Sequence, residues 1–539
     1  MIKRTGDPRG LRRIHQASLH SIHQASLRRS HQTSLRRVHR AGLALVHFAI
    51  LLLAAPPLLL GAEMPGDTPL HRNGYSRIST SAEISADLAA IATASPLARV
   101  ETIGQSVQGR PLETLVFKKP GDGTERLRVL IVGSQHGAAE PAGSEALLTL
   151  ARALAFGDLR PLLDELDIVL FPNANPDGRD LDRRTNANGV NINTDFVLAR
   201  EPETRALLAA LDRYQPQALL DSHESAVLKR KSLGLEGWLT DFEIQFEFAN
   251  NPGVPGAVRE FSERELLPAL LAATSTEGAK AHRYIGEITS TRQPITNGGL
   301  TLRNFRNAAG VQNRVSMLVE TRLDSRELSY PTWRNIAVRE ARQLHCLRTF
   351  LAVVHNRRAA IRAATAQPVR GGFALHASYQ PALDHPQVAI GLRRRDTGEL
   401  VTHHFADHRR VALADAVAPP PAYLVTAAQD LIRPVLDAQG ITYRQLDSPR
   451  GYRVLEEHFK LPTAAGGRVT LVHSIAVTRE APAGSLVIEL AQRRGRQAVL
   501  LLDPRSTSSL FRYPEFAARL GADEPPPVQP VLAVTGGNP

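Results

Sequence analysis

The stretch "LRVLIVGSQHGAAEPAGSEALLTLARALA", residues 127–155, decides the fold class. Residues 127–133 form a mostly apolar run of the kind found in a strand that is covered on both faces. After a short polar loop, Pro141 opens a helical pattern, since proline is well tolerated in the first turn of a helix. Strand, loop and helix in this order predict the first unit of an α/β domain.

Three further apolar runs, at residues 166–171, 217–222 and 314–321, predict more strands of the same kind. A second helical pattern, "EPETRALLAAL" at residues 201–211, lies between them. Strands that alternate with helices indicate an α/β domain rather than an all-β or all-α one.

Chemically active side chains follow these strands. His136 and Glu140 come just after the first strand, His223 comes at the end of the third, and Glu320 at the end of the fourth. In open α/β sheets the ligand site lies at the carboxyl ends of the strands. The sequence therefore predicts that two histidines and two glutamates meet at one edge of the sheet.

This residue set suits a metal-dependent hydrolase. Catalytic zinc typically takes three protein ligands, commonly two His and one Glu, and keeps a position for water, whose pKa it lowers. A free carboxylate then serves as general base, and Glu320 fits that role. The chain holds a single cysteine, Cys346, which excludes an internal disulfide and a cysteine-based zinc cluster.

Five segments in order carry a family resemblance: "HGAAEP" (136–141), "NPDG" (175–178), "RRTNANGVNINTDF" (183–196), "DSHE" (221–224) and "LVETR" (318–322). This set resembles the zinc carboxypeptidases of the carboxypeptidase A/B type. The resemblance implies a mixed, mostly parallel sheet flanked by helices, in a catalytic domain over residues 70–360. It also implies hydrolysis of a peptide bond by a zinc-bound water with a glutamate as general base.

Carried over by position, the resemblance implies that one zinc ion per chain is bound by His136, Glu140 and His223. Glu320 matches the general base, and Arg184 matches the arginine that polarises the scissile carbonyl. Asn193 matches the asparagine that helps to hold the C-terminal carboxylate of the substrate. The expected substrate is a peptide or an acyl-amino acid.

Two departures concern the zinc site and the lid. The family places two residues between the His and Glu ligands, whereas three separate His136 from Glu140. We predict a one-residue expansion of the loop that leaves both ligands in place. The tyrosine that the family carries some twenty residues before the base is missing from "ITNGGLTLRNF" (295–305), and Tyr284 is the nearest candidate.

A third departure concerns the substrate. Thr194 stands where the family has the arginine that pairs with the substrate carboxylate, and threonine cannot form that bidentate pair. Arg303 or Arg306 is the candidate replacement cation. The loss keeps a second hypothesis open, an amidase or deacylase on the same scaffold that acts on cell-wall peptides or acyl-amino acids. A third hypothesis is a metal-free binding module without catalytic activity.

Several neighbouring residues receive structural interpretations. We expect Asp177 and Gly178 to form a turn, because their motif is a turn sequence. We expect Asp221 and Glu224 to be second-shell or surface acids rather than ligands. Solvated surface positions are predicted for two groups, a basic rim and a histidine cluster: Arg179, Arg183 and Arg200; His403, His404 and His408.

The formal net charge of +12 is concentrated in residues 1–40, which hold ten Lys and Arg and one acid and repeat with a period of eight. We therefore expect a basic, disordered leader there and no nucleic-acid partner for the folded part. Residues 41–62 are apolar and uncharged, as in a secretory signal, and are long enough to anchor the chain in a membrane if they are not cleaved. The sequence predicts an exported protein, periplasmic or extracellular.

Beyond residue 365 the apolar runs become short and alternate, with Pro and Gly between them. We predict a smaller, mostly β C-terminal region over 366–522 with one helix, at "AAQDLIRPVLDAQG" (427–440). A Pro-rich tail over 523–539 is expected to be flexible.

Overall fold

The computed structural model describes residues 67–121, 125–225, 232–276, 279–323, 335–369, 371–462, 467–520 and 526–535. All of them belong to one compact unit, residues 63–539. The predicted leader (1–40) and signal segment (41–62) lie outside the described residues. Within those residues, no helix has the length and apolar character that crossing a membrane requires.

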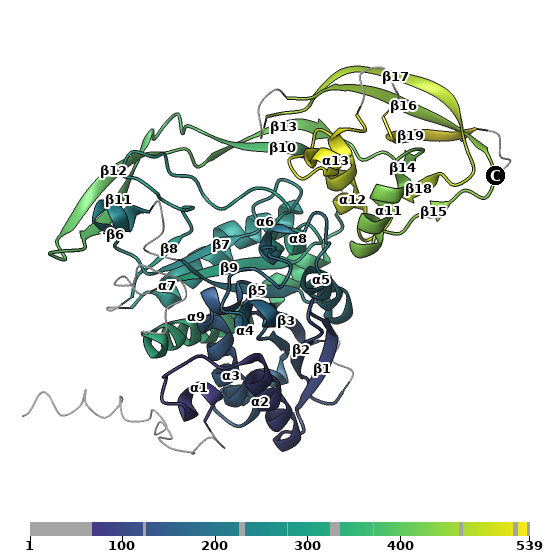
Figure 1. The fold of residues 1–539 in the computed structure, drawn as a ribbon. Helices are drawn as coiled ribbons and strands as arrows, with labels where there is room; N and C mark the ends of the chain where they lie inside the picture. The colour runs from purple at the N-terminus through teal and green to yellow at the C-terminus, as the bar shows by residue number, and fades with distance from the viewer. Residues whose placement is uncertain are drawn as a thin grey trace, which may run out of the picture. The chain divides into compact units, whose positions relative to one another are not determined.

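An eight-stranded mixed sheet forms the first part of the fold, with the strand order β1-β2-β4-β3-β5-β9-β7-β8 (Figure 1). Its central strands β4, β3, β5 and β9 run parallel, and antiparallel pairs flank them. The strands are β1 (Ala98–Gln105), β2 (Pro111–Phe117), β3 (Leu127–Val132), β4 (Leu166–Phe171), β5 (Ala218–Ser225), β7 (Ile244–Phe248), β8 (Ala281–Arg283) and β9 (Val315–Arg322). All four predicted strands are present, and the α/β fold class is confirmed.

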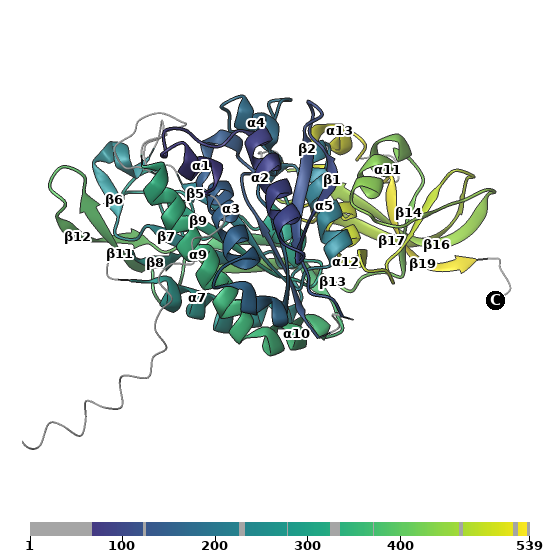
Figure 2. The ribbon, with the colours of Figure 1, turned by 90° about the horizontal axis from the view of Figure 1, so that it is seen from below.

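Helices cover both faces of this sheet (Figure 2). Alternate side chains of β3 point to opposite faces, so Val129 and Ile131 join one apolar cluster and Leu130 and Val132 join another. The first cluster includes α2 (Ser81–Ala94), α3 (Ala142–Ala155) and α9 (Ile336–Asn356), and the second includes α5 (Pro202–Tyr214) and α8 (Phe305–Gly310). The remaining helices of this part are α1 (Pro69–Arg72), α4 (Pro176–Asp180), α6 (Gly256–Phe261), α7 (Leu267–Thr274) and α10 (Arg358–Ala366).

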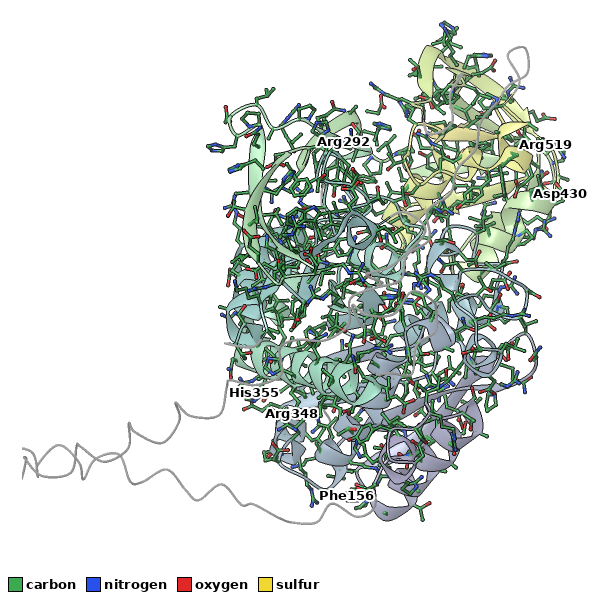
Figure 3. The ribbon with its side chains drawn as sticks, turned by 60° about the vertical axis from the view of Figure 1, so that its left-hand side comes forward. Phe156, Arg292, Arg348, His355, Asp430 and Arg519 are labelled. Atoms are coloured by element: carbon green, nitrogen blue, oxygen red, sulfur yellow. The ribbon has the colours of Figure 1, made fainter. Side chains whose placement is uncertain are left out.

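The helix α9 packs one side on the sheet and exposes the other. Leu347, Phe350 and Leu351 belong to the core cluster. Arg348 and His355, labelled in Figure 3, form ion pairs with Asp158 and Glu165, which precede β4 in the chain. The helix is therefore held at its buried and its outer side.

The C-terminal part contains a six-stranded sheet with the order β15-β18-β14-β19-β16-β17. Its strands are β14 (Ala422–Val425), β15 (Arg444–Gln445), β16 (Arg450–Lys460), β17 (Thr470–Ala481), β18 (Leu486–Glu489) and β19 (Val528–Thr535). The prediction of a flexible tail is wrong for β19, which pairs with β14 and β16 because its apolar residues, such as Val528 and Val531, are buried there.

The expectation of one helix in this region is also wrong. The predicted helix is present as α11 (Gln429–Ala438), but α12 (Gly495–Leu502) and α13 (Pro514–Ala517) accompany it. α12 is fully apolar over Val499–Leu502 and enters the same core cluster as α9. A short apolar run of this kind does not distinguish a buried helix from a strand.

Two smaller sheets complete the described fold. β10 (Phe373–Gln380) pairs with β13 (Arg410–Val417). The hairpin of β11 (Gln387–Arg394) and β12 (Leu400–Ala406) pairs through β11 with β6 (Trp238–Thr240), so that β12, β11 and β6 lie side by side (Figure 1).

Candidate active site

The loop after β3 brings its histidine and glutamate together. His136 precedes a single 3₁₀ turn, Gly137–Ala139, and Glu140 follows that turn directly. Because of this turn, the spacing of three residues between the two ligands still leaves the side chains of His136 and Glu140 close together. Gly137 has φ +50° and packs so tightly that a Cβ there would lie 2.5 Å from the main chain of Gly178. The loop thus requires a residue without a side chain at this position.

The second histidine and the other glutamate come from adjacent strands. His223 on β5 lies in register with Glu320 on the parallel neighbour β9. Both positions follow the last apolar residues of their strands, as the sequence predicted. Since side chains alternate along a strand, Asp221 shares the face of His223.

His136, Glu140 and His223 form the one group of three or more metal-type donors found among the described residues, with ligand atoms that all lie within 4.8 Å of one another. All three are buried, at 3%, 4% and 2% exposure. The Nδ1 atom of His223 lies 3.0 Å from Oε2 of Glu140, and the two imidazole ring centres are 4.9 Å apart. Two imidazoles and one carboxylate this close together match the donor set of a zinc site.

A carboxylate stands behind His223. Oδ2 of Asp221 lies 3.0 Å from Nε2 of His223, and Gln135 donates a hydrogen bond of 2.6 Å to Oδ1 of Asp221. A carboxylate this close to Nε2 stabilises a proton there when Nδ1 serves as a metal ligand. Asp221 is therefore a buried acid in contact with a candidate ligand, and the surface position that the sequence left open is wrong.

The electrostatics favour a cation among these donors. Burial raises the pKa of Glu140, but His136 and Arg184 outweigh it and hold that pKa well below its usual range. Burial lowers the pKa of His223, yet Asp221 and Glu140 reverse the effect and raise it well above 6.5. The same atoms that favour a proton here favour a metal ion in its place, because both compete for one set of ligands.

A cavity of about 240 Å³ opens beside the donor group. Glu140 and Glu320 lie in its wall together with Arg184, whose side chain pairs with Glu140 and is 41% exposed. The predicted base and the predicted oxyanion arginine thus border the same space as a metal donor. Much of the remaining lining consists of apolar side chains, those of Leu233, Trp238, Phe242, Ile285 and Ile288.

Tyr284 lines this cavity too, directly after β8. Burial raises the pKa of its phenol, and the nearby carboxylate of Glu320 raises it further. The hydroxyl therefore stays protonated next to the predicted base. No tyrosine stands at the family's spacing in "ITNGGLTLRNF", and only the fold shows that the more distant Tyr284 reaches this space.

The predicted substrate-binding residues do not line this cavity, although one of them lies beside a donor. Nδ2 of Asn193 is 3.4 Å from Nε2 of His223, while its Oδ1 accepts a hydrogen bond from the main chain of Phe305. Thr194 bonds through its hydroxyl to the carbonyl of Asn191, and Arg303 is exposed with Nε 3.4 Å from the carbonyl of Thr194. Among the described residues that line the cavity, Asn193, Thr194 and Arg303 are absent.

Contacts that the sequence did not suggest hold the strand ends in place. Glu224, next to His223, forms a buried double contact with Arg339 of α9 and accepts a hydrogen bond from the main chain of Ala142, two residues after Glu140. Gln343, one helical turn after Arg339, also contacts the strand ends. Nothing in the local pattern of α9 marks these residues, because their partners are distant in sequence.

Two of the structural interpretations need correction. The "NPDG" motif begins a short helix, α4, with Asn175 as its cap, rather than a simple turn. Asp177 is fully buried and accepts hydrogen bonds from Ser106 and from the main chain of Gln108. Arg179, predicted in a solvated rim, is buried as well and pairs with the buried Glu145.

A family model described as zinc carboxypeptidase matches residues 84–229, a segment that holds all three donors and Arg184. The chain contains a zinc carboxypeptidase domain. The predicted resemblance is confirmed, and the family together with the His–Glu–His group confirms zinc as the predicted cofactor. Glu320 lies beyond the matched residues.

Named relatives agree with the zinc carboxypeptidase domain. Probable carboxypeptidase 2 of Arthroderma benhamiae is 28% identical over 204 residues, which make up 37% of this chain and 38% of that protein. Carboxypeptidase D of Mus musculus is 34% identical over 140 residues, 23% of this chain and 10% of that protein. The chain thus spans about two fifths or less of the length of these relatives. The match to the crystal structure of a metallo-carboxypeptidase from Burkholderia cenocepacia covers 53% of this chain and 71% of that chain, with 21% identity and a TM-score of 0.40.

Proposed function

We propose that this protein is a zinc-dependent hydrolase of the carboxypeptidase type, which cleaves the amide bond of a peptide. The observation that carries the proposal is the position of Glu140. Its carboxylate belongs both to the buried His–Glu–His donor group and to the wall of the cavity that Glu320 and Arg184 border.

The chain's residues divide the chemistry between them. His136, Glu140 and His223 hold the zinc ion, which when bound polarises a carbonyl and acidifies water. Glu320 takes a proton from the attacking water as its oxygen bonds to the carbonyl carbon. When the carbon–nitrogen bond breaks, Glu320 returns that proton to the leaving nitrogen, so that one water is consumed and one amine and one carboxylic acid are formed.

Arg184 stabilises the charge that develops on the carbonyl oxygen. The support for this role is that its guanidinium is partly exposed at the cavity and pairs with Glu140. A fixed cation next to a developing oxyanion is typically worth 10²–10³ in rate. Tyr284 supplies a protonated hydroxyl to the same lining.

A second candidate function is an amidase or deacylase on the same scaffold. The supporting observation is Thr194, whose hydroxyl is already bonded to Asn191, while Arg303 points its Nε toward a main-chain carbonyl outside the cavity. A substrate with a free C-terminal carboxylate requires a cation there for a bidentate pair. A substrate whose C-terminal carboxyl group is amidated does not.

The test uses the chain from residue 63 onward. Zinc content is measured first, and about one zinc per chain is expected. Hydrolysis of benzoyl-glycyl-phenylalanine is then compared with that of its C-terminal amide. A preference for the free acid supports a carboxypeptidase, and equal or better cleavage of the amide supports the amidase. Absence of zinc after reconstitution contradicts both and leaves a binding module.

The proposal includes export from the cytoplasm. Its support is the apolar segment 41–62, preceded by basic residues. Fractionation of cells that express the full chain tests it, with a chain that lacks residues 1–62 as the control. Recovery of the full chain in the cytoplasm would contradict export.

A further inference from the structure

The outer wall of the cavity is joined to a segment far along the chain. Five residues of the segment 233–240 line the cavity: Leu233, Gly234, Trp238, Leu239 and Thr240. The last three form β6, which pairs antiparallel with β11 of the β11–β12 hairpin, residues 387–406. Trp238 lies opposite Arg394, and Thr240 lies opposite Leu392. Figure 1 shows the hairpin beside β6.

Apolar packing continues from the hairpin to the cavity. Ile390, Leu392 and Phe405 of the hairpin belong to one cluster with Leu233, Phe242, Ile285 and Ile288, and Trp238 packs against it. The last five of these residues line the cavity, whereas the hairpin residues do not. The hairpin therefore supports the apolar wall from behind.

Polar contacts fix this arrangement on both sides. Arg395 donates through its side chain to the carbonyl of Gly234 and through its main chain to that of Gly237. The main-chain N–H of Asp241 donates to the carbonyl of Gly391, where a Cβ would meet Asp241 at 2.9 Å. These contacts hold the wall segment at both ends.

We infer that the β11–β12 hairpin is a specificity-determining element, which shapes the cavity for a bulky apolar side chain next to the scissile amide. The inference rests on the proposed function. The lining combines the charged side chains of Glu140, Glu320 and Arg184 with an apolar set: Leu233, Trp238, Phe242, Ile285 and Ile288. An apolar side chain gains from burial against this wall, whereas an acidic one meets the carboxylates of Glu287 and Glu320.

Leu392 offers a clean substitution, because it is 1% exposed in the cluster and does not line the cavity. Leu392→Ala loosens the support of the wall without removing a cavity residue. Leu400→Ala is the matched control, since Leu400 lies on the same hairpin and is 50% exposed.

The experiment compares peptides that differ only in the residue after the scissile bond, Phe, Ala, Lys or Glu. We expect the wild type to prefer Phe. Leu392→Ala should raise KM for the Phe peptide about tenfold, the range given by one or two lost methylene contacts. Its kcat, its zinc content and its KM for the Ala peptide should stay unchanged, as should every value for Leu400→Ala.

Three results would overturn the inference: a wild-type preference for Lys or Glu, an unchanged ratio of Phe to Ala in Leu392→Ala, or an equal loss on all peptides. These are distinct from failure of the proposed function, which shows as absent zinc or absent hydrolysis in the wild type. A readout without turnover covers that case. N-acetyl-phenylalaninamide should quench the fluorescence of Trp238 in a Trp333→Phe background more than N-acetyl-alaninamide does, and Leu392→Ala should reduce the difference.

Discussion

The side-chain amide of Gln343 donates a hydrogen bond of 2.7 Å to the main-chain carbonyl of His223. The same nitrogen donates to the hydroxyl of Thr321, the residue after Glu320, over 2.9 Å, and the amide oxygen accepts from Ser222. One buried side chain on α9 thus connects the strand that carries a metal donor with the strand that carries the predicted base.

Gln343→Glu keeps the size of this side chain and removes its donors. We expect zinc affinity to fall about 10–100-fold, as for other second-shell substitutions, with kcat reduced at saturating zinc. Arg348→Ala on the outer side of α9 is the control, because it loses only a surface ion pair. Zinc titration and kcat measured at saturating metal check this, and wild-type values for both would contradict the positioning role.

Substitution of any metal donor should abolish zinc binding. His136→Ala, Glu140→Ala and His223→Ala each leave two donors where zinc takes at least three protein ligands. His404→Ala is a matched control, since His404 is exposed on β12. Metal analysis after dialysis is the measurement. Retention of one zinc per chain in all three variants would place the metal elsewhere.

Glu320→Gln should retain zinc and lose activity. The amide cannot take a proton from water, so kcat should fall by about 10²–10⁴. Glu480→Gln is the control, because Glu480 is exposed on β17 and does not line the cavity. Activity near the wild-type level in Glu320→Gln would assign the proton transfer to another group.

Gly137→Ala tests the tight loop between His136 and Glu140. A Cβ there meets the main chain of Gly178 at 2.5 Å, whereas at Gly74, which also has positive φ, it meets nothing within 4 Å. Gly74→Ala should cost about 1 kcal/mol of stability from backbone strain alone. We expect a larger loss for Gly137→Ala, accompanied by weaker zinc binding, and chemical denaturation with zinc titration will measure both. Equal effects of the two substitutions would show that the contact relaxes.

Glu457 in the C-terminal sheet predicts a pH dependence of stability. Burial raises the pKa of this carboxyl to about 6, with Asp503 adding to the shift and Arg505 opposing it. The folded state therefore keeps a proton that the unfolded state loses near pH 4.5, and stability falls as pH rises from about 4.5 through 6. The total loss of unfolding free energy, which is complete above about pH 6, is at most about 2 kcal/mol.

Glu457→Gln should remove this dependence and be more stable than the wild type at pH 7.5, but not at pH 4.5. Thermal unfolding across this range is the measurement. A difference in Tm between the two proteins that does not change with pH would contradict the assignment.

Much of the site follows from local sequence. The apolar runs before His136, His223 and Glu320 specify buried parallel strands, and the carboxyl ends of such strands meet at one edge. Residue type and position along the chain were therefore sufficient to select the metal donors and the candidate base. The errors occurred where a short apolar run has two interpretations, as in α12, where a Pro-rich composition suggested a flexible tail, as in β19, or where a polar motif is buried, as with Asp177 and Arg179.

The sequence by itself predicted the four central parallel strands, two of the helices that cover them and the candidate donors, because these depend on neighbours within a few residues. Only the tertiary structure decided that a 3₁₀ turn absorbs the extra residue before Glu140, and that Asp221 lies behind His223. It also decided that Gln343, 120 residues away from His223, joins the two strand ends, and that the β11–β12 hairpin supports the cavity wall. Such contacts come from packing between distant segments, and no local periodicity encodes them.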